Sequence, residues 1–365
     1  METILRIFVF IFGLLVVSWT LFSAIRSFVL PRGMPDFVTR SVFILTWQLF
    51  RIRLHWAQTY LERDRIAAFF APVATLLLLP VWVALILIGF AGMYWALGVE
   101  PFTNAVILSG SSMLTLGFRT SEVLVVDLIM FCQATIGLIL VALLIAYLPT
   151  MYAAFSRREE AINLLEVRAG NPPSAIEMLL RYNRIHGLGR LSELWRSWEI
   201  WFANLEESHT SLPALVFFRS ARPEHSWITS AGAVLDAASL TLSSIDTPYD
   251  ANAALCIRAG YLALRRICDY LDLPYTPNPH YPEQPISITK DEFLAAVEDL
   301  TKNGVPIKED REQAWLDFAG WRVNYDDVLL NLAGITMPPI APWSSDRAKG
   351  FSPVIFPWKD KKKQG

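Results

Sequence analysis

The residues best suited to chemistry in this chain lie in one short stretch, Thr115-Leu-Gly-Phe-Arg119. A row of backbone carbonyl oxygens along a water-filled path can replace the water shell of a cation. Gly117 has no Cβ, so its backbone can turn the carbonyl group toward such a path. Thr115 adds a hydroxyl oxygen next to this row. The stretch therefore has the residue types that a cation filter requires.

Long uncharged segments on both sides of this stretch indicate a membrane protein. Residues 7–25, 66–99 and 128–156 contain no Asp, Glu, Lys or Arg. A helix that crosses a bilayer needs about 20 apolar residues, so these segments predict three transmembrane helices. A cleaved signal peptide is the alternative for residues 1–26, although no Ala-x-Ala cleavage site follows. The composition, 53% hydrophobic, agrees with a membrane protein that also has a soluble part.

The distribution of arginine predicts which side of the membrane each segment faces. Cytoplasmic loops carry an excess of Lys and Arg. Residues 26–65 are rich in arginine, whereas residues 98–124 contain a single basic residue, Arg119. We therefore expect residues 26–65 and the part from residue 157 onward to be cytoplasmic, and residues 98–124 and the N-terminus to be external. Arg6 does not follow this pattern. The predicted localisation is the cell membrane, crossed several times.

The segment between the second and third predicted spans is expected to enter the membrane without crossing it. Residues 102–114 can form a short helix, and the backbone that follows would then lie at membrane depth without hydrogen-bond partners. Such backbone is tolerated only where protein buries it or where it lines a water-filled path. An ordinary external hairpin is the alternative interpretation of Thr115 and Gly117.

These elements together resemble the pore module of the tetrameric potassium channel family: an outer helix at 66–97, a pore helix at 102–114, a filter, and an inner helix at 123–156. The filter of that family runs Thr-Val-Gly-Tyr-Gly. Thr115-Leu-Gly-Phe118 matches its first four positions, with Leu for Val and Phe for Tyr. The resemblance covers a quarter of the chain at most. It implies an all-α membrane protein and a homotetramer that conducts monovalent cations, potassium above all.

The resemblance also assigns roles to single residues. It implies a hinge in the inner helix at Gly137 and a cytoplasmic constriction of the pore near Pro149 and Tyr152. A helix can also bend at proline, so Pro149 is a second candidate for the gating hinge. Close packing between membrane helices is the alternative role for Gly137. The implied filter residues are Thr115, Leu116, Gly117, Phe118 and Arg119.

Arg119 departs from the family pattern. The family has glycine at this position, with a left-handed backbone that arginine adopts at a cost of about 1–2 kcal/mol. A tetramer would also place four guanidinium groups at the outer mouth, and two unit charges ~4 Å apart repel by about 4 kcal/mol at an effective dielectric constant of about 20. Arg119 is therefore predicted to hinder cations that approach the filter, unless it extends into water or pairs with Glu122.

The chain is predicted to consist of five parts. An N-terminal transmembrane helix (1–30) precedes a cytoplasmic or interfacial helical segment (31–65) and the pore module (66–156). A helical cytoplasmic domain (157–336) follows and could gate the pore. The Pro-rich tail (337–365) ends in Lys-Asp-Lys-Lys-Lys-Gln-Gly, and we expect it to be disordered.

Periodicity and end signals predict further local structure. In residues 36–64, large apolar side chains recur on one side of a helix that faces either the lipid interface or the helical bundle. Tyr94 and Trp95 fall where an interfacial aromatic belt is expected. Thr289 and Glu292 form a capping box. The inner helix is expected to continue to Gly170, and further helices are predicted at 191–205, 226–246, 251–271 and 308–333.

Other function classes lack supporting residues in this sequence. The five histidines show no spacing typical of metal ligands, and the three cysteines form no Cys-x-x-Cys pair. There is no Gly-rich phosphate loop and no acid–base set that belongs to one site, so we expect no cofactor and no enzyme activity. A net charge of −2 provides no basic field for nucleic acid.

The predicted function is a cation channel subunit in the lipid bilayer. The alternative is a non-conducting, membrane-anchored regulatory or scaffold protein; a membrane enzyme is a third and weaker class.

Overall fold

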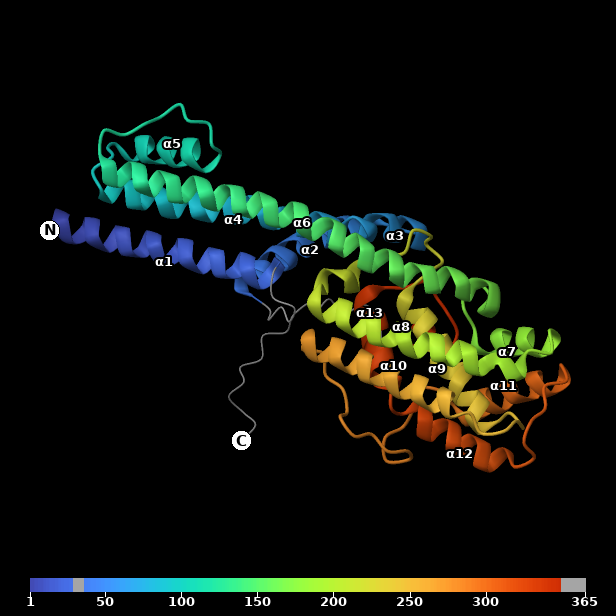
Figure 1. Ribbon diagram of the computed structural model, residues 1–365. Coiled ribbons are helices and arrows are strands. Elements are labelled where there is room, and N and C mark those ends of the chain that lie inside the picture. The colour runs from blue at the N-terminus through green and yellow to red at the C-terminus, as the bar shows by residue number, and fades with distance from the viewer. Residues whose placement is uncertain (29–35, 349–365) are drawn as a thin grey trace. The chain divides into compact units, whose positions relative to one another are not determined.

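The computed structural model describes residues 1–28 and 36–348, and their regular structure is helical apart from one isolated β-bridge, Ile245 with Ile307 (Figure 1). The predicted all-α fold class is confirmed. The chain forms two compact units. The N-terminal unit comprises Met1–His55 and Phe69–Ala153, and the C-terminal unit comprises Trp56–Ala68 and Ala154–Gly365.

Three helical segments are long and apolar enough to cross a membrane, and they include the three segments in which spans are predicted. They are Glu2–Phe28, Tyr60–Ala96 and Leu124–Ala169. The second segment consists of α3 (Tyr60–Ala68) and α4 (Phe70–Ala96), so the outer helix begins a few residues later than the predicted residue 66. The remaining helices of the N-terminal unit are α1 (Glu2–Phe28), α2 (Phe37–Trp56), α5 (Phe102–Met113) and the first part of α6 (Leu124–Ala169).

Helices α1 and α4 pack closely because glycine faces glycine. A Cβ on Gly13 would collide with the Gly89 carbonyl oxygen, and a Cβ on Gly89 would collide with the Gly13 carbonyl. Small residues let membrane helices approach in this way. At the start of α1, Arg6 pairs with Glu2 at 2.8 Å and with Glu100, just beyond the end of α4. Arg6, the one arginine that does not follow the orientation pattern, therefore has its charge neutralised by acidic side chains.

The predicted segment 31–65 is divided between the two units. Helix α2 buries Phe43, Trp47 and Leu54, and the Trp47 ring lies 5.0 Å from the Phe70 ring, so its apolar side packs within the bundle. Helix α3 belongs to the C-terminal unit, where Tyr60 donates a hydrogen bond to the Pro223 carbonyl at 2.9 Å.

The C-terminal unit is built around α9 (Trp227–Ser243), which is buried along its whole length. The helix predicted at 191–205 is present, and its apolar side chains Leu191, Trp195, Trp198, Phe202 and Leu205 are buried. The capping box of Thr289 and Glu292 is confirmed. The other elements of the C-terminal unit are the end of α6, α7 (Ala175–Arg184), η1 (Leu188–Arg190), α8 (Leu191–Ser211), η2 (Pro213–Phe217), α10 (Ala251–Tyr270), α11 (Lys290–Lys302), α12 (Arg311–Arg322), α13 (Asp326–Thr336) and η3 (Ser345–Arg347).

Two expectations for the C-terminal unit are wrong in part. The single helical region predicted at 308–333 is two helices, α12 and α13, separated by a short turn. The start of the tail is ordered, since Ala341 and Ser344 are buried and the Trp343 carbonyl accepts a hydrogen bond from Arg322 at 2.8 Å. The rest of the predicted tail, 349–365, lies outside the described residues.

Candidate functional site

Helix α5 is joined to both long helices beside it by one chain of hydrogen bonds. The Ser109 hydroxyl donates to the Leu87 carbonyl of α4 at 2.8 Å. The Gln133 amide of α6 donates to the Ser109 hydroxyl at 2.7 Å and to the Ser109 carbonyl at 3.1 Å. The Tyr94 hydroxyl of α4 donates to the Gln133 Oε1 at 2.8 Å. The chain of bonds therefore runs through all three helices.

The side chains of this hydrogen-bond chain are completely buried. Tyr94, Ser109 and Gln133 each have an exposed fraction of 0%. Leaving a buried donor or acceptor without a partner costs about 1–3 kcal/mol, so the three side chains hold α5 in one position. Tyr94 is therefore not the interfacial belt residue that the sequence predicts. The signal missed in the sequence is Gln133, a polar residue inside an uncharged span.

The end of α5 also contacts α6 directly. The Ser112 hydroxyl donates to the Met130 carbonyl at 2.7 Å. A Cβ on Gly137 would collide with the Met113 carbonyl oxygen. Glycine is thus required at 137 for this close approach. Helix α6 passes through Gly137 and Pro149 as one continuous helix, and a hinge at these residues stays a prediction.

A residue with a left-handed backbone conformation caps the C-terminal end of α5. Thr115 has a φ of 54°, and the amides of Thr115 and Leu116 donate to the carbonyls of Ser112 at 3.0 Å and Ser111 at 2.8 Å. This pair of bonds defines a Schellman motif, in which glycine is the usual left-handed residue. A β-branched residue is an outlier there. Thr115 thus holds a strained backbone at the first position of the predicted filter.

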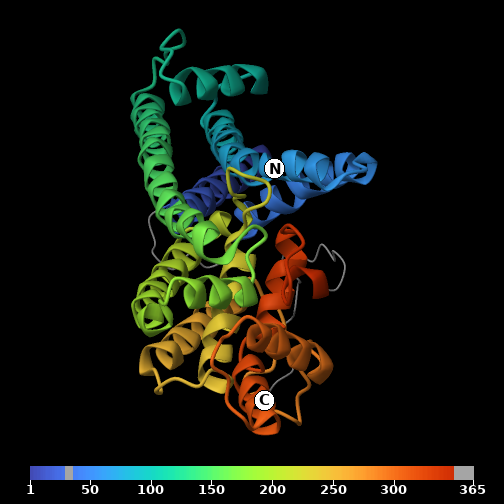
Figure 2. The same ribbon diagram turned by 90° about the vertical axis from the view of Figure 1, so that its right-hand side faces the viewer.

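The predicted filter residues lie together in one exposed loop. This loop, between α5 and α6, projects from the N-terminal unit in both ribbon views (Figures 1 and 2). Leu116 and Phe118 are 60% and 63% exposed, and no atom lies within 4 Å of a Cβ built on Gly117. Gly117 has a φ of 68°, so left-handed residues occur at 115 and 117. The left-handed backbone expected at Arg119 is wrong, because Arg119 has no positive φ. Thr115 adopts this conformation instead and has the associated strain.

One face of α6 carries exposed side chains at alternating spacings of four and three residues. Leu124, Phe131, Leu138 and Ile145 on this face are 62–71% exposed. Such spacing is typical of helices that pack against other helices in a left-handed bundle. We call this face the α6 stripe; its members are Leu124, Leu128, Phe131, Thr135, Leu138, Ala142, Ile145, Pro149 and Tyr152.

Buried charges in the C-terminal unit mainly stabilise the fold. Arg158 donates to the Leu215 carbonyl at 2.9 Å and to the Phe218 carbonyl at 2.7 Å, and it pairs with Glu159 at 2.8 Å. Burial, together with the nearby Arg158 guanidinium, lowers the pKa of His209 well below its usual range. His209 is therefore neutral at pH 7, as its place among buried groups requires.

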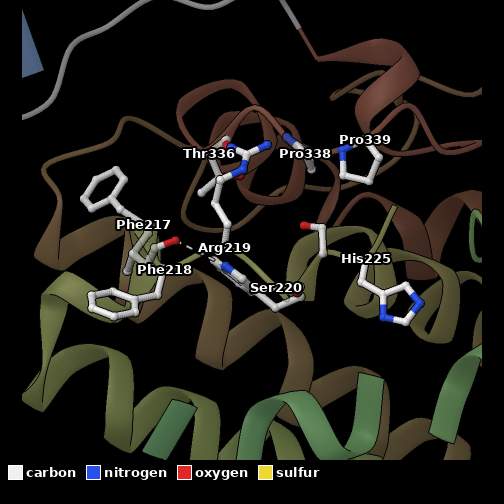
Figure 3. Close-up of a pocket in the computed structure, with 11 residues that line it drawn as sticks. Phe217, Phe218, Arg219, Ser220, His225, Thr336, Pro338 and Pro339 are labelled. Atoms are coloured by element: carbon white, nitrogen blue, oxygen red, sulfur yellow. Dashed lines mark hydrogen bonds between the residues drawn. The ribbon is translucent and has the colours of Figure 1, made fainter. Parts of the chain in front are cut away.

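A small pocket beside Arg219 has a similar structural role (Figure 3). Its volume of about 20 Å³ has room for one water molecule and not for an organic ligand. Arg219 donates to the Thr336 carbonyl at 2.8 Å and pairs with Asp64 of α3. The pocket therefore lies where α3, the segment after η2, and the end of α13 are joined.

The described residues contain no group of three or more His, Cys, Asp or Glu that could hold a metal ion. Comparison with protein families, with curated proteins and with solved structures finds no match for this chain.

Proposed function

We propose that the chain is the subunit of a homotetrameric cation channel, in which four copies of the loop after α5 surround one axis. The observation that carries this proposal is the buried link from Ser109 to both α4 and α6. It holds a short helix that ends in an exposed turn with left-handed residues at Thr115 and Gly117. One loop supplies only a quarter of a carbonyl-lined path, so four copies are needed.

The α6 stripe supports assembly through α6. Its regular spacing is what a bundle of equivalent helices uses. A cysteine at Leu138 should form disulfide-linked dimers under oxidising conditions in a background with Cys132→Ala. The matched control is Leu140→Cys, because Leu140 is 1% exposed and faces its own bundle. Equal cross-linking of both variants would count against assembly through this stripe.

One observation favours the alternative function, a non-conducting membrane-anchored regulatory or scaffold protein. Arg119 lies in this loop, and no ion pair joins it to Glu122 or to another acidic side chain of the described residues. Four such charges around one axis would oppose the passage of cations. Such a protein would keep the fourfold assembly and lack ion flux.

Ion flux through purified protein in lipid vesicles decides between the two functions. The measurement uses separate gradients of potassium, sodium and chloride. We expect potassium flux in the wild type and none in Gly117→Ala, whose Cβ would disturb the left-handed turn. The matched control is Gly320→Ala, a position with open space in the C-terminal unit. A tetramer with no flux of any ion would establish the non-conducting alternative, and a monomer in detergent would contradict both.

A further inference from the structure

The C-terminal unit contains a cavity of about 260 Å³ that the sequence does not predict. Its wall comes from the first turn of α7, the middle of α9, the first turns of α11, and the segment that follows α13. Pockets for drug-sized ligands are typically about 300–1,000 Å³, so this one suits a smaller molecule. Its polar and aromatic wall residues are Ser174, Asp236, Glu292 and Trp343.

Asp236 gives one side of the cavity a buried carboxyl group. Its side chain is 1% exposed, and its Oδ1 accepts hydrogen bonds from Arg322 at 2.6 Å and from the Tyr325 hydroxyl at 2.9 Å. No described group donates a hydrogen bond to its Oδ2. Arg322 also pairs with Asp326 at 2.7 Å, so one guanidinium serves two carboxylates. Burial raises the pKa of Asp236, and the Arg322 guanidinium opposes this rise, so a cation beside Oδ2 would stabilise the ionised carboxylate.

A second carboxylate lies on the wall, at the start of α11. Glu292 accepts from Arg347 at 2.7 Å and from the Thr289 amide at 2.8 Å. These bonds, with that from Arg347 first, lower the pKa of Glu292 to about 2, so it is ionised at pH 7. Asp236 and Glu292 together favour a cation, and an ammonium group can donate to Asp236 Oδ2.

The first turn of α7 favours an anion. The Ser174 side chain caps the Glu177 amide, whereas the amides of Ala175 and Ile176 have no acceptor among the described residues. Free amides at a helix N-terminus bind carboxylates and other anions. The rest of the wall is apolar, from Ala295, Ala296, Pro342 and the Trp343 ring.

We infer that this cavity binds a small zwitterion of the free amino acid class, with its ammonium group at Asp236 and its carboxylate at the first turn of α7. The ammonium group of one ligand would donate to Asp236 Oδ2, while its carboxylate accepts from the free amides of α7. A simple amine would use only the first of these sites, and a simple carboxylic acid only the second. The inference does not depend on whether the protein conducts ions, because binding needs only the C-terminal unit of the full chain.

The test measures thermal unfolding of the full chain in detergent with each of the twenty L-amino acids added separately. We expect at least one of them to raise Tm in a concentration-dependent manner, since a ligand that binds only the folded state stabilises it. The N-acetyl derivative of that amino acid removes the ammonium charge, and its amide removes the carboxylate. Each derivative should bind at least tenfold more weakly than the parent amino acid.

Two variants test the location of the site. Asp236→Asn keeps the shape of the side chain and should weaken binding at least tenfold, whereas the exposed neighbour control Asp291→Asn should not. Ala296→Phe fills the cavity, leaves every charge in place, and should abolish binding, so it decides the matter if Asp236→Asn does not fold. The inference is overturned if no amino acid raises Tm, if an amide binds as tightly as its parent, or if Ala296→Phe still binds.

Discussion

At the scale of single residues, the loop after α5 depends on two side chains with opposite effects. Thr115 holds a left-handed backbone that glycine would adopt without strain, and it offers a hydroxyl group at the exposed end of α5. Arg119 follows two positions after Gly117 and adds an exposed positive charge. The first residue sets the backbone of the proposed filter, and the second sets the electrostatic potential around it.

Removing the charge of Arg119 should raise potassium flux. Repulsion at an exposed site is screened, so we expect an increase of about fivefold at low salt and a smaller one at high salt. Arg119 is not left-handed, so Arg119→Ala and Arg119→Gly should act alike. Flux into vesicles at two salt concentrations measures the effect, with the exposed Arg196→Ala as the control. Unchanged flux in both Arg119 variants would place this side chain away from the ion path.

Replacing Thr115 by glycine should separate stability from conduction. Thr115→Gly removes the left-handed strain of a β-branched residue, worth about 1 kcal/mol, and should raise Tm by about 2 °C. It also removes the hydroxyl oxygen, so potassium flux should fall. Thr115→Ser keeps the hydroxyl and should retain most of the flux. A lower Tm for Thr115→Gly would show that the threonine is stabilised in the loop by contacts in the assembly.

At the scale of elements, α5 is too short to hold its place through its own backbone. An isolated helix of this length is marginal in water, and its buried serines replace apolar contacts with hydrogen bonds. Ser109 and Ser112 reach α4 and α6, while Gly137 lets α6 approach the last turn of α5. The position of the loop is therefore determined by groups on three different helices.

Replacing Gln133 by leucine should release α5. The variant leaves the Tyr94 hydroxyl without its acceptor and the Ser109 carbonyl without this donor, at a combined cost of about 2–4 kcal/mol. Tm in detergent should fall, and potassium flux should be lost because the loop is no longer held. The matched control is Thr150→Val, since Thr150 lies on α6 outside the stripe and its hydroxyl bonds only to Ala146 of its own helix, at 3.1 Å. Equal losses in the two variants would contradict the role of Gln133.

At the scale of the whole molecule, the chain joins a unit with long apolar helices to a helical unit with a polar surface. Both contain part of α6, which runs without a break from Leu124 to Ala169. The arginine distribution predicts that the loop after α5 is external and that the C-terminal unit is cytoplasmic.

This orientation can be tested with single cysteines in a background with Cys132→Ala. A membrane-impermeant maleimide should label Thr120→Cys in intact cells, because residue 120 is exposed in the loop that is predicted to be external. It should label Glu309→Cys, an exposed position before α12, only after the cells are permeabilised. Labelling of Glu309→Cys in intact cells would reverse the topology, and the buried Cys256 and Cys268 provide the background signal.

The sequence by itself determined the features that depend on neighbouring residues. Uncharged length predicts the three spans, and the pair Thr289 and Glu292 predicts the start of α11, because a capping box closes within one turn of helix. The separation of α12 from α13 was missed, since the turn between them contains neither glycine nor proline.

Only the tertiary structure decided the features that join distant parts of the chain. Tyr94, Ser109 and Gln133 are ordinary polar residues in the sequence, and they form one buried hydrogen-bond chain because three helices bring them together. The cavity arises in the same way, from an aspartate of α9 that faces the first turn of α7 across a space between helices. Periodicity describes one helix at a time, whereas the free energy of a buried polar group depends on partners that may be dozens of residues away.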